Sequence, residues 1–279
     1  MATRDEREVA ARFAARYGAP QAEVIRDVEM AVIGGTWGAN GYTTRHQADL
    51  LARSLDLDDG MRLLDLGAGR GWPGLYLASS TGCEVVLVDV PIEGLVLAAQ
   101  RATREHLDAR AVAAVSSARH LPFGAASFDA IVHTDVLCCV RPKTAVLRAC
   151  RTCLRPGGRT AFLTIHTAPG LGRKDRQRAS RDGPFAVAAP REHRAMLASA
   201  GFVEIGETDL TDEFERVALA WIETSDQHHD RLAQVLGEQD LGERQADRRL
   251  QLRAIQDGLL RRSLFTATRP RRSQHAAHP

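Results

Sequence analysis

The sequence predicts an α/β fold in which a doubly wound, parallel sheet is covered by helices on both faces. Short segments rich in Val, Ile and Leu alternate with helical patterns through the middle of the 279-residue chain, as parallel strands buried on both sides do. A glycine cluster follows the first of these segments and permits a tight turn into the next helix. The length suits one large domain, or one domain with an added cap.

The N-terminal part is predicted to be helical. In residues 5–33, apolar side chains recur at helical spacing, which indicates one helix that ends at Gly34-Gly35. Residues 36–42 are rich in glycine and aromatic residues, so we expect no regular structure there. Another helix is expected over about 43–55, before the turn residues 58–60.

The central part alternates between strands and helices. Helices are expected from near Pro73, over 91–107 and over 142–154. A proline is favoured in a first helical turn because its missing N–H is not needed there. The strands are expected at 61–66, 84–89, 111–115, 128–133 and 159–165.

The C-terminal third has a different organisation. A helix over 190–200 and a strand over 202–207 continue the alternating pattern. Two helical stretches, 213–236 and 240–262, then precede a last strand at 263–268. Residues 166–190 form a long loop rich in arginine, and loops of that length are usually functional or disordered.

Composition and charge exclude several classes of protein. Hydrophobic residues make up 44% of the chain and charged residues 26%, the balance of an ordinary globular protein. The formal net charge of +2 argues against a protein that binds nucleic acid by bulk electrostatics. No apolar run approaches the roughly 20 residues that a membrane span needs, and the N-terminus lacks the apolar stretch of a secretory signal. We therefore expect a cytoplasmic protein.

The five cysteines are predicted to be reduced thiols. Most of them lie in apolar surroundings, as buried free cysteines do. Cys150 and Cys153 have the CxxC spacing of zinc and redox sites, but no second ligand pair accompanies them. They also belong to a helical pattern in which both can face inward. We therefore expect no metal site.

The densest functional signal is the segment Asp65-Leu-Gly-Ala-Gly-Arg-Gly71. Alternate glycines after a buried strand let a ligand approach bare backbone, and the following helix offers free N–H groups. Asp89 ends the next strand, where nucleotide-binding folds place an acceptor for ribose hydroxyls, although it could simply cap a helix. Residues 69–74 also satisfy the GxGxxG pattern of dinucleotide sites. With Asp89 as the ribose acceptor, a dinucleotide site and another nucleotide-binding site that uses the glycines at 67, 69 and 71 would both hold an adenosine-containing ligand.

Three further patterns decide whether this ligand is a dinucleotide or another adenosine-containing cofactor. They are Asp65 before the glycines, which gives DxGxGxG, Ser117–Phe123 ahead of Ser127-Phe-Asp129, and Leu154-Arg-Pro-Gly-Gly158. In this order and spacing, the sequence resembles a class I S-adenosylmethionine-dependent methyltransferase. The resemblance is continuous over about 60–165, weaker to 207, and returns in the last strand. It implies a seven-stranded, mostly parallel sheet whose last strand is antiparallel to the rest.

The resemblance also implies a division of the chain. The methyltransferase core would comprise 58–212 and 263–270. Residues 1–57 would form an N-terminal helical cap over the cofactor, and 213–262 a helical lid inserted before the last strand. The tail, 271–279, would be disordered.

The family pattern implies which residues hold the cofactor. Asp65 would lie near its ammonium end, and Asp89 would accept its ribose hydroxyls. Ser117 stands where many relatives have aspartate, so adenine recognition would rest on the backbone N–H of Ala118. The other cofactor residues would be Gly67, Ala68, Gly69 and Gly71 against its amino-acid part, Val90 against adenine, and His133 and Thr134 on the methionine side.

Catalysis and acceptor binding are expected at the carboxyl ends of the strands. Methyl transfer from a sulfonium is an in-line displacement whose main demand is alignment. An oxygen acceptor also gains from a general base, for which His166, His133 and Asp135 are the candidates. We expect His166 to be the base, whereas Asp135 could instead be a helix N-cap. The expected substrate contacts are Trp37, Tyr42, Asp135 and His166.

The expected function is therefore methyl transfer from S-adenosylmethionine to oxygen or nitrogen of a small molecule, with S-adenosylhomocysteine as product. An RNA or protein methyltransferase is one alternative, which the arginines of 173–181 favour and the near-neutral net charge opposes. An NAD-dependent oxidoreductase is another, which the 154–158 motif disfavours. A non-catalytic cofactor-binding protein is the third, and the intact glycine loop and Asp89 oppose it.

Overall fold

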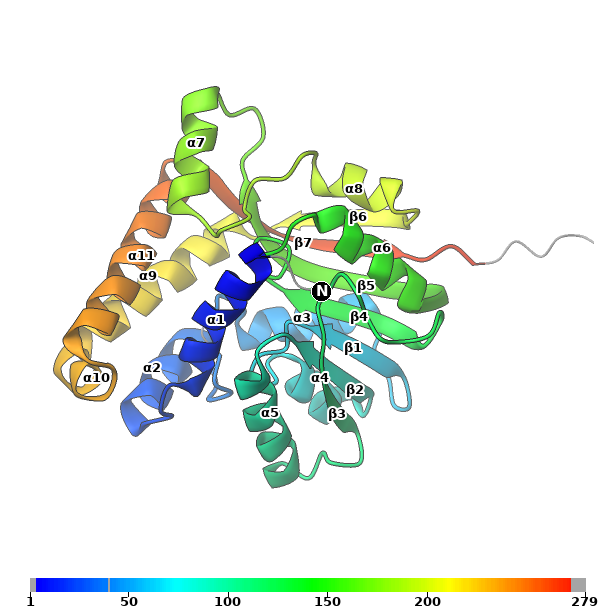
Figure 1. The fold of residues 1–279 in the computed structure, drawn as a ribbon, viewed down its shortest axis with the longest axis horizontal. Helices are drawn as coiled ribbons and strands as arrows, with labels where there is room; N and C mark the ends of the chain where they lie inside the picture. The colour runs from blue at the N-terminus through cyan, green and yellow to red at the C-terminus, as the bar shows by residue number, and fades with distance from the viewer. Residues whose placement is uncertain (1–3, 40, 272–279) are drawn as a thin grey trace, which may run out of the picture.

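A computed structural model describes residues 4–39 and 41–271 of the chain. Its centre is a seven-stranded sheet with the strand order β3-β2-β1-β4-β5-β7-β6 (Figure 1). Strand β7 is antiparallel to β5 and β6, and the other neighbouring strands are parallel. The predicted doubly wound sheet with an antiparallel last strand is thus confirmed. Apart from Arg271, the tail expected over 271–279 lies outside the described residues.

The strands lie where the apolar segments predict them. The main differences are that β5 begins earlier than expected, where Leu154 pairs with Phe128 of β4, and that β5 ends later and β7 begins earlier, where the two strands pair with each other. The strands are β1 Arg62–Leu66, β2 Glu84–Asp89, β3 Ala111–Val115, β4 Phe128–Thr134, β5 Leu154–Thr167, β6 Val203–Asp209 and β7 Leu260–Thr268.

The helices differ from the expectation in three places. The helical stretch expected over 213–236 is broken at His228, and the one expected over 240–262 ends at Gln256, because β7 begins at Leu260. The single helix expected over 5–33 is wrong: two helices lie there, separated around Gly18 and Pro20, because proline lacks the N–H that a helix interior needs. The long loop expected over 166–190 contains a helix. The helices are α1 Arg4–Gly18, α2 Glu23–Ile33, α3 Arg45–Leu55, α4 Gly74–Thr81, α5 Ile92–Arg104, α6 Lys143–Cys153, α7 Arg173–Asp182, α8 His193–Ser199, α9 Thr211–Gln227, α10 His229–Leu236 and α11 Glu238–Gln256.

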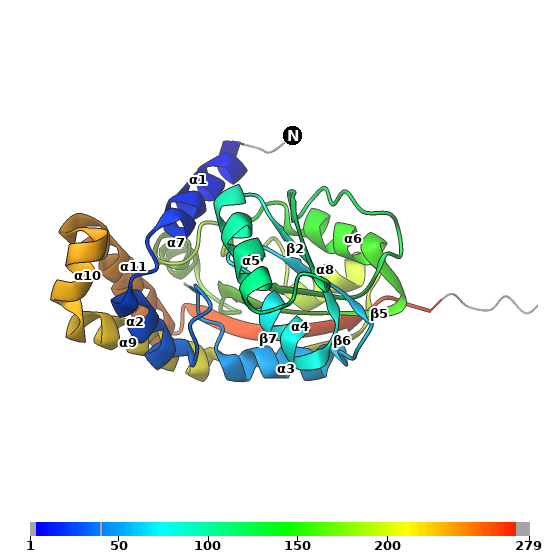
Figure 2. The ribbon, with the colours of Figure 1, turned by 90° about the horizontal axis from the view of Figure 1, so that it is seen from below.

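Alternating side chains of the strands give the sheet two buried faces. In β1, Leu63 belongs to a core shared with α3, α4 and α5, whereas its neighbour Leu64 belongs to a core shared with α6 and α8. Both side chains are 0% exposed. Figure 2 shows the sheet with helices on either side of it. The two faces therefore close the core and leave the carboxyl ends of the parallel strands as the edge on which a ligand can bind.

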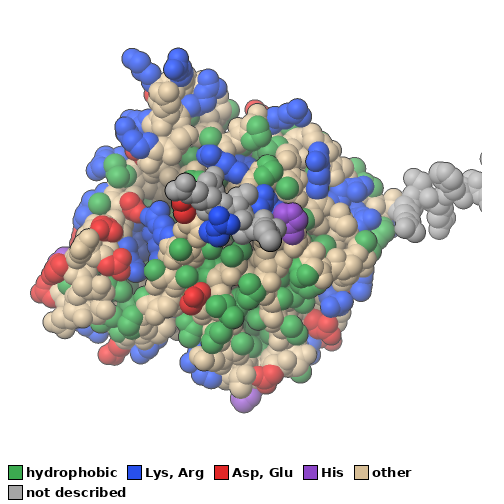
Figure 3. Space-filling view, in the orientation of Figure 1, with side chains coloured by type: hydrophobic (Ala, Val, Ile, Leu, Met, Phe, Trp, Pro, Cys, Tyr) green, Lys and Arg blue, Asp and Glu red, His purple; other side chains and the backbone are tan. Residues whose placement is uncertain are grey.

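A separate group of helices covers one end of the sheet. Figure 1 shows α2, α9, α10 and α11 together on the left. They share a core that includes Val28, Val217, Trp221 and Leu241. Helix α1 packs on α5, and α7 packs on α11. Lysine and arginine side chains gather over α7 (Figure 3). None of the described helices has the length and apolar character that crossing a membrane requires.

Candidate functional site

A cavity of about 430 Å³ lies at the carboxyl ends of β1, β2 and β4. Residues that follow these strands form its sheet side. On the opposite side, α1, α11 and residues 181–185 cover it. The volume is in the range of small-molecule and cofactor sites, roughly 300–1,000 Å³. The cavity is therefore the candidate active site, at the edge of the sheet where open α/β folds bind ligands.

The glycine loop after β1 forms one wall of the cavity. Gly67, Gly69 and Gly71 have φ angles of 70°, 51° and 87°, a backbone region that glycine enters most readily. A Cβ atom on Gly67 would lie 2.4 Å from Cγ2 of Val136, so the loop leaves no room for a side chain there. Gly67 and Gly69 line the cavity, whereas Gly71 packs against Leu75.

Asp89 ends β2 beside this loop and lines the cavity. Its Oδ2 accepts a hydrogen bond from the backbone N–H of Gly69 at 2.8 Å, and its Oδ1 accepts one from Val90 at 2.7 Å. Burial raises the pKa of Asp89 to about 6, although these two bonds and a side-chain hydrogen bond from Tyr17 act to lower it. The carboxyl group is therefore fixed against the glycine loop.

Asp65 lies within β1 and is only 1% exposed. Its Oδ2 accepts a hydrogen bond from the backbone N–H of Gly74 at 2.9 Å. Its Oδ1 has no hydrogen-bond partner among the described residues. Burial raises the pKa of Asp65 to about 8, and the nearby Asp89 contributes to this rise. A buried carboxyl group with one free oxygen is a place for a further donor or a positive charge.

Several other residues that the sequence predicts at the cofactor site also line the cavity. They are Ala68, Val90, Ser117, Ala118 and Thr134. They follow β1, β2 and β3 or, for Thr134, end β4, and these strands are neighbours in the sheet order β3-β2-β1-β4. Strand order thus brings five separate chain positions to one continuous wall.

Tyr17, on α1, is a cavity residue that the sequence does not single out. Its ring lies against Gly69 and Gly94, where an added Cβ would come within 2.9 Å of it. Burial raises the pKa of Tyr17 well above its ordinary value, so the hydroxyl stays protonated and can donate to Asp89. Its apolar helical pattern predicts only a core residue. The packing of α1 on α5 is what places it over the glycine loop.

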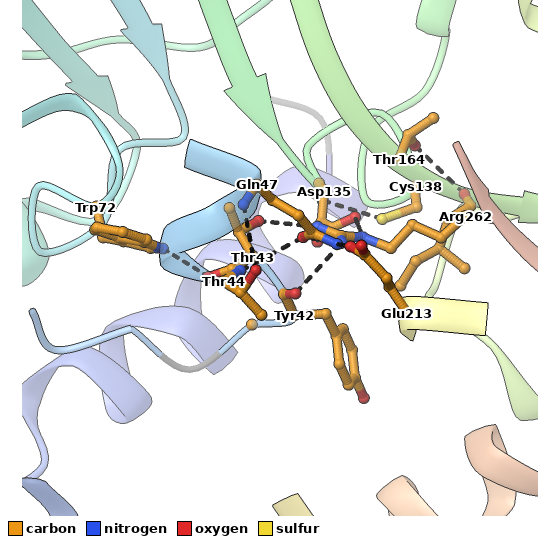
Figure 4. Close-up of polar contacts among 12 residues, drawn as sticks. Tyr42, Thr43, Thr44, Gln47, Trp72, Asp135, Cys138, Thr164, Glu213 and Arg262 are labelled. Atoms are coloured by element: carbon orange, nitrogen blue, oxygen red, sulfur yellow. Dashed lines mark hydrogen bonds and ion pairs between the residues drawn. The ribbon is translucent and has the colours of Figure 1, made fainter. Parts of the chain in front are cut away.

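Asp135, just after β4, forms an ion pair with Arg262 of β7 (Figure 4). Arg262 is 0% exposed, and its Nε and Nη2 donate to the two carboxylate oxygens at 3.1 and 2.9 Å. The guanidinium also donates to Gln47 Oε1 and Thr43 Oγ1, both at 2.8 Å, and to the backbone oxygen of Tyr42 at 3.3 Å. Arg262 therefore ties the sheet to the chain segment that leads into α3.

The position of Asp135 settles one alternative left by the sequence. Its backbone φ is 56°, and its N–H donates to the carbonyl of Leu163 at 2.8 Å. The next helix, α6, begins only at Lys143, so Asp135 is not its N-cap. Its side chain lines the cavity with both oxygens bound to Arg262. A lone arginine in a strand carries no sequence signal for this pairing.

The two aromatic residues expected to contact the substrate lie at different depths. Tyr42 lines the cavity, packs edge-on against Phe214 at 4.8 Å between ring centroids, and donates a hydrogen bond to Gln251 of α11. Trp37 does not line the cavity. It stacks on Trp72, with centroids 3.9 Å apart, and Trp72 is the ring that faces the cavity.

The structure does not bring His133 and His166 to the cavity, and no histidine is among the described residues that line it. Both lie within their strands, because β4 and β5 each run one residue further. His133 is 0% exposed and stacks on Phe162 at 4.4 Å between centroids. Nε2 of His166 lies 3.0 Å from Oγ of Ser263. Burial lowers the pKa of both rings, that of His133 to about 3. Both are therefore neutral at pH 7.

Comparison with known proteins identifies relatives. Residues 64–162 match a family model described as a methyltransferase domain. A 27-O-demethylrifamycin SV methyltransferase of Amycolatopsis mediterranei (strain S699) is 33% identical over 185 residues, which cover 63% of this chain and 68% of that protein. A phosphoethanolamine N-methyltransferase of Triticum aestivum is 24% identical over 227 residues, which cover 81% of this chain but only 44% of that protein.

Solved structures share the fold. The geranyl diphosphate C-methyltransferase from Streptomyces coelicolor A3(2), in complex with Mg²⁺, geranyl diphosphate and S-adenosyl-L-homocysteine, superposes with a TM-score of 0.73 at 18% identity, covering 96% of this chain and 99% of that chain. At this identity the likeness concerns the fold alone. The family-model match contains the glycine loop, Asp89 and Asp135, whereas α1 and α11 lie outside it.

Proposed function

Because this chain belongs to the class I S-adenosylmethionine-dependent methyltransferases, we propose that it methylates an oxygen or nitrogen atom of a small-molecule metabolite. The cofactor of this family, S-adenosylmethionine, supplies a methyl group on a positively charged sulfonium. The observation that carries the proposal is one covered cavity with the cofactor motif on its sheet side. Since the methyl group is already activated, the protein's main task is alignment of the acceptor, worth up to roughly 7–11 kcal/mol of barrier.

The residues of the sheet side fit this cofactor. Gly67 and Gly69 bring bare backbone to the cavity, and Oδ1 of Asp65 has no hydrogen-bond partner among the described residues. In the proposal, Asp89 accepts the ribose hydroxyls, Asp65 attracts the ammonium group, and Gly67–Gly71 lie along the amino-acid part. Val90 would lie against the adenine ring, and the backbone N–H of Ala118 would recognise it.

The cap, 1–57, and the insert, 213–262, are proposed to form the acceptor side. Helices α1 and α11 belong to these parts and cover the cavity opposite the glycine loop. A cavity of about 430 Å³ has the size of small-molecule sites, which favours a metabolite over a segment of RNA or folded protein. Tyr42 and Gln251, hydrogen-bonded to each other, join the two parts at this wall.

We propose that the acceptor is aligned without a general base. The described residues that line the cavity include no histidine, and Asp135 uses both carboxylate oxygens on Arg262. A nitrogen nucleophile, or an oxygen acid that ionises near neutral pH, can lose its proton to solvent. This account therefore favours an amine or an acidic hydroxyl over a plain alcohol.

The test is a methyl-transfer assay with S-adenosylmethionine and a panel of amines, phenols, carboxylates, alcohols and alkenes. We expect S-adenosylhomocysteine release that depends on an oxygen or nitrogen acceptor, with a singly methylated product by mass spectrometry. S-Adenosylhomocysteine should also stabilise the fold by about 2.7 kcal/mol at 100-fold excess over its dissociation constant. Methylation of an alkene carbon alone would overturn the choice of atom. Stabilisation by NAD without stabilisation by S-adenosylhomocysteine would overturn the whole proposal.

A further inference from the structure

Five of the described arginines line the covered side of the cavity. Arg12 and Arg181 pair with Asp247 and Asp182, and the other three are Arg16 of α1 and Arg244 and Arg248 of α11. Burial lowers the pKa of Arg248 to about 10, and the like charges of Arg16 and Arg244 add to this. Burial also lowers the pKa of Arg16, and Arg12 and Arg244 contribute. The charges of this arginine cluster, Arg16, Arg244 and Arg248, therefore act on one another at one part of the cavity.

Two of the three arginines in the cluster lack carboxylate partners. Among the described residues, neither Arg16 nor Arg248 forms an ion pair with a carboxylate. Arg248 lies over the ring of Trp221, 4.5 Å from its centroid, and has one long hydrogen bond of 3.4 Å to a serine hydroxyl. Arg244 pairs with Asp240 at 2.6 Å through Nη2, but its buried Nε has no partner within the described chain. Guanidinium N–H donors thus remain available at this wall.

The carboxylates that line the cavity have other hydrogen-bond or ion-pair partners, although the charge of Asp247 also acts on Arg16. They pair as Asp247 with Arg12, Asp182 with Arg178 and Arg181, Asp135 with Arg262, and Asp89 with backbone N–H groups of Gly69 and Val90. Burying a charge without a partner costs free energy. The covered side therefore carries an excess of positive charge that an anionic ligand would balance.

We propose that Arg16, Arg244 and Arg248 bind an oxyanion, a carboxylate or phosphate group, of the methyl acceptor. The inference rests on the proposed function, because it specifies the acceptor class for the same cavity. Guanidinium groups present paired N–H donors that match the oxygens of both groups. The acceptor is anchored by its charged end at α1 and α11, and its nucleophilic atom faces the glycine loop.

The carboxylate of the cofactor is the other possible source of this anion. Arg16 adjoins Tyr17, which lies over the glycine loop, so this arginine can reach toward either ligand. Arg244 and Arg248 come from the insert, and Arg248 stacks on Trp221 of α9 there. The arginine within the glycine loop, Arg70, is already bound to backbone carbonyls at the end of α1. These positions favour the acceptor over the cofactor as the source of the anion.

Inorganic phosphate and benzoate are the probes for this subsite. Each is titrated calorimetrically, at low ionic strength, into the full chain with and without S-adenosylhomocysteine. We expect millimolar binding to the wild type, weakened about tenfold or more in Arg248→Gln, as the loss of a hydrogen bond to a charged group implies. Arg249→Gln is the matched control, because this neighbour on α11 pairs with Asp226 at 2.7 Å and should leave anion affinity unchanged. Arg16→Gln is the second test variant if Arg248→Gln folds poorly.

Competition identifies the source of the anion. For an acceptor subsite, phosphate and S-adenosylhomocysteine bind together, and Arg248→Gln changes the affinity for S-adenosylhomocysteine by less than about twofold. If phosphate displaces S-adenosylhomocysteine but not 5′-methylthioadenosine, which lacks the amino-acid part, the arginines serve the cofactor and the proposal is overturned. Equal anion affinity in the wild type and both glutamine variants, or no anion binding at all, overturns it as well. Failure of S-adenosylhomocysteine to bind would count against the proposed function alone, because the anion titrations do not require it.

Discussion

The two sides of the cavity are built in different ways. The glycine-loop side centres on one local motif, the loop after Asp65 together with Asp89, and residues that end or follow β3 and β4 complete it. The covered side comes from positions far apart in the sequence, Arg16 on α1 and Arg248 on α11 among them. A local motif can be recognised before folding, whereas a set of residues brought together by packing cannot. The first side is proposed to hold the cofactor common to the family, and the second to select this chain's own acceptor.

Strand β7 connects the two sides. It carries Arg262, whose side chain reaches Asp135 at the sheet edge and Gln47 on α3. One guanidinium group therefore holds residues 42–47 against the edge of the sheet that borders the cavity. Substitutions on each side, and at Arg262, can separate what each contributes to stability and to ligand affinity.

The largest effect is expected from Arg262→Gln, because it removes the connection. It leaves Asp135 without its buried partner, and loss of one member of a buried ion pair costs about 3–5 kcal/mol of the free energy of unfolding. Urea unfolding measures this change. The neighbouring Arg261→Gln is the control: its pair with Asp209 is exposed and should contribute less than about 1 kcal/mol. If both variants lose equally little free energy of unfolding, the pair of Arg262 with Asp135 does not hold the two sides together.

Asp89→Ala should weaken binding on the glycine-loop side without unfolding it. Loss of a charged acceptor for ribose hydroxyls costs about 1.5–3 kcal/mol per hydrogen bond, which corresponds to at least about tenfold in affinity for S-adenosylhomocysteine. Calorimetry gives the affinity and circular dichroism the fold. Glu84→Ala, at the opposite and exposed end of β2, should leave the affinity unchanged. If a folded Asp89→Ala protein binds as tightly as the wild type, Asp89 only supports the glycine loop.

Asp65 should make the stability of the cofactor-free protein depend on pH. Its pKa is about 8 in the folded protein against an ordinary value of 3.8, so the folded state binds the proton more tightly than the unfolded state. The free energy of unfolding should therefore fall as pH rises from about 4 to about 8, by at most about 1.4 kcal/mol per pH unit for this group. Asp65→Asn should remove this slope.

The comparison is clearest between pH 6 and pH 8, because Asp89, with a pKa of about 6, titrates mainly at lower pH. Urea unfolding of both proteins across this range is the measurement. Parallel pH profiles for the wild type and Asp65→Asn would show that burial of this carboxyl group does not carry the effect.

The smallest effect is expected from His166→Ala. The ring contacts Ser263 and does not line the cavity, and burial lowers its pKa, so the turnover of correctly folded enzyme should change only a few-fold. A pH–rate profile of both proteins with any accepted substrate is the test. A loss of about 10²–10⁴ in turnover, together with a changed profile, would instead identify His166 as the general base.

The sequence predicts those features that depend on residues close together in the chain. The parallel strands, Gly67 and Asp89 were predictable, because a buried strand followed by glycines and a strand-end carboxylate are patterns of neighbouring residues. His133 and His166 were placed at strand exits, yet both strands run one residue further. Because side chains alternate along a strand, one residue separates an edge position from the interior.

The remaining features depend on contacts between distant positions. Arg262 and Asp135 are 127 residues apart in the sequence, and nothing near either residue indicates the other. The same holds for Arg16 and Arg248, which meet only after α1 and α11 have packed over the cavity. Tyr17 was likewise indistinguishable from an ordinary core residue of an amphipathic helix.

The separation of the cavity into a cofactor side and an acceptor side is tested most directly by titrating S-adenosylhomocysteine into three proteins: the wild type, Asp89→Ala and Arg248→Gln. The account predicts equal affinity, within about twofold, for the wild type and Arg248→Gln, and an affinity lower by about tenfold or more for Asp89→Ala. The opposite order, with affinity lost in Arg248→Gln and kept in Asp89→Ala, would contradict it.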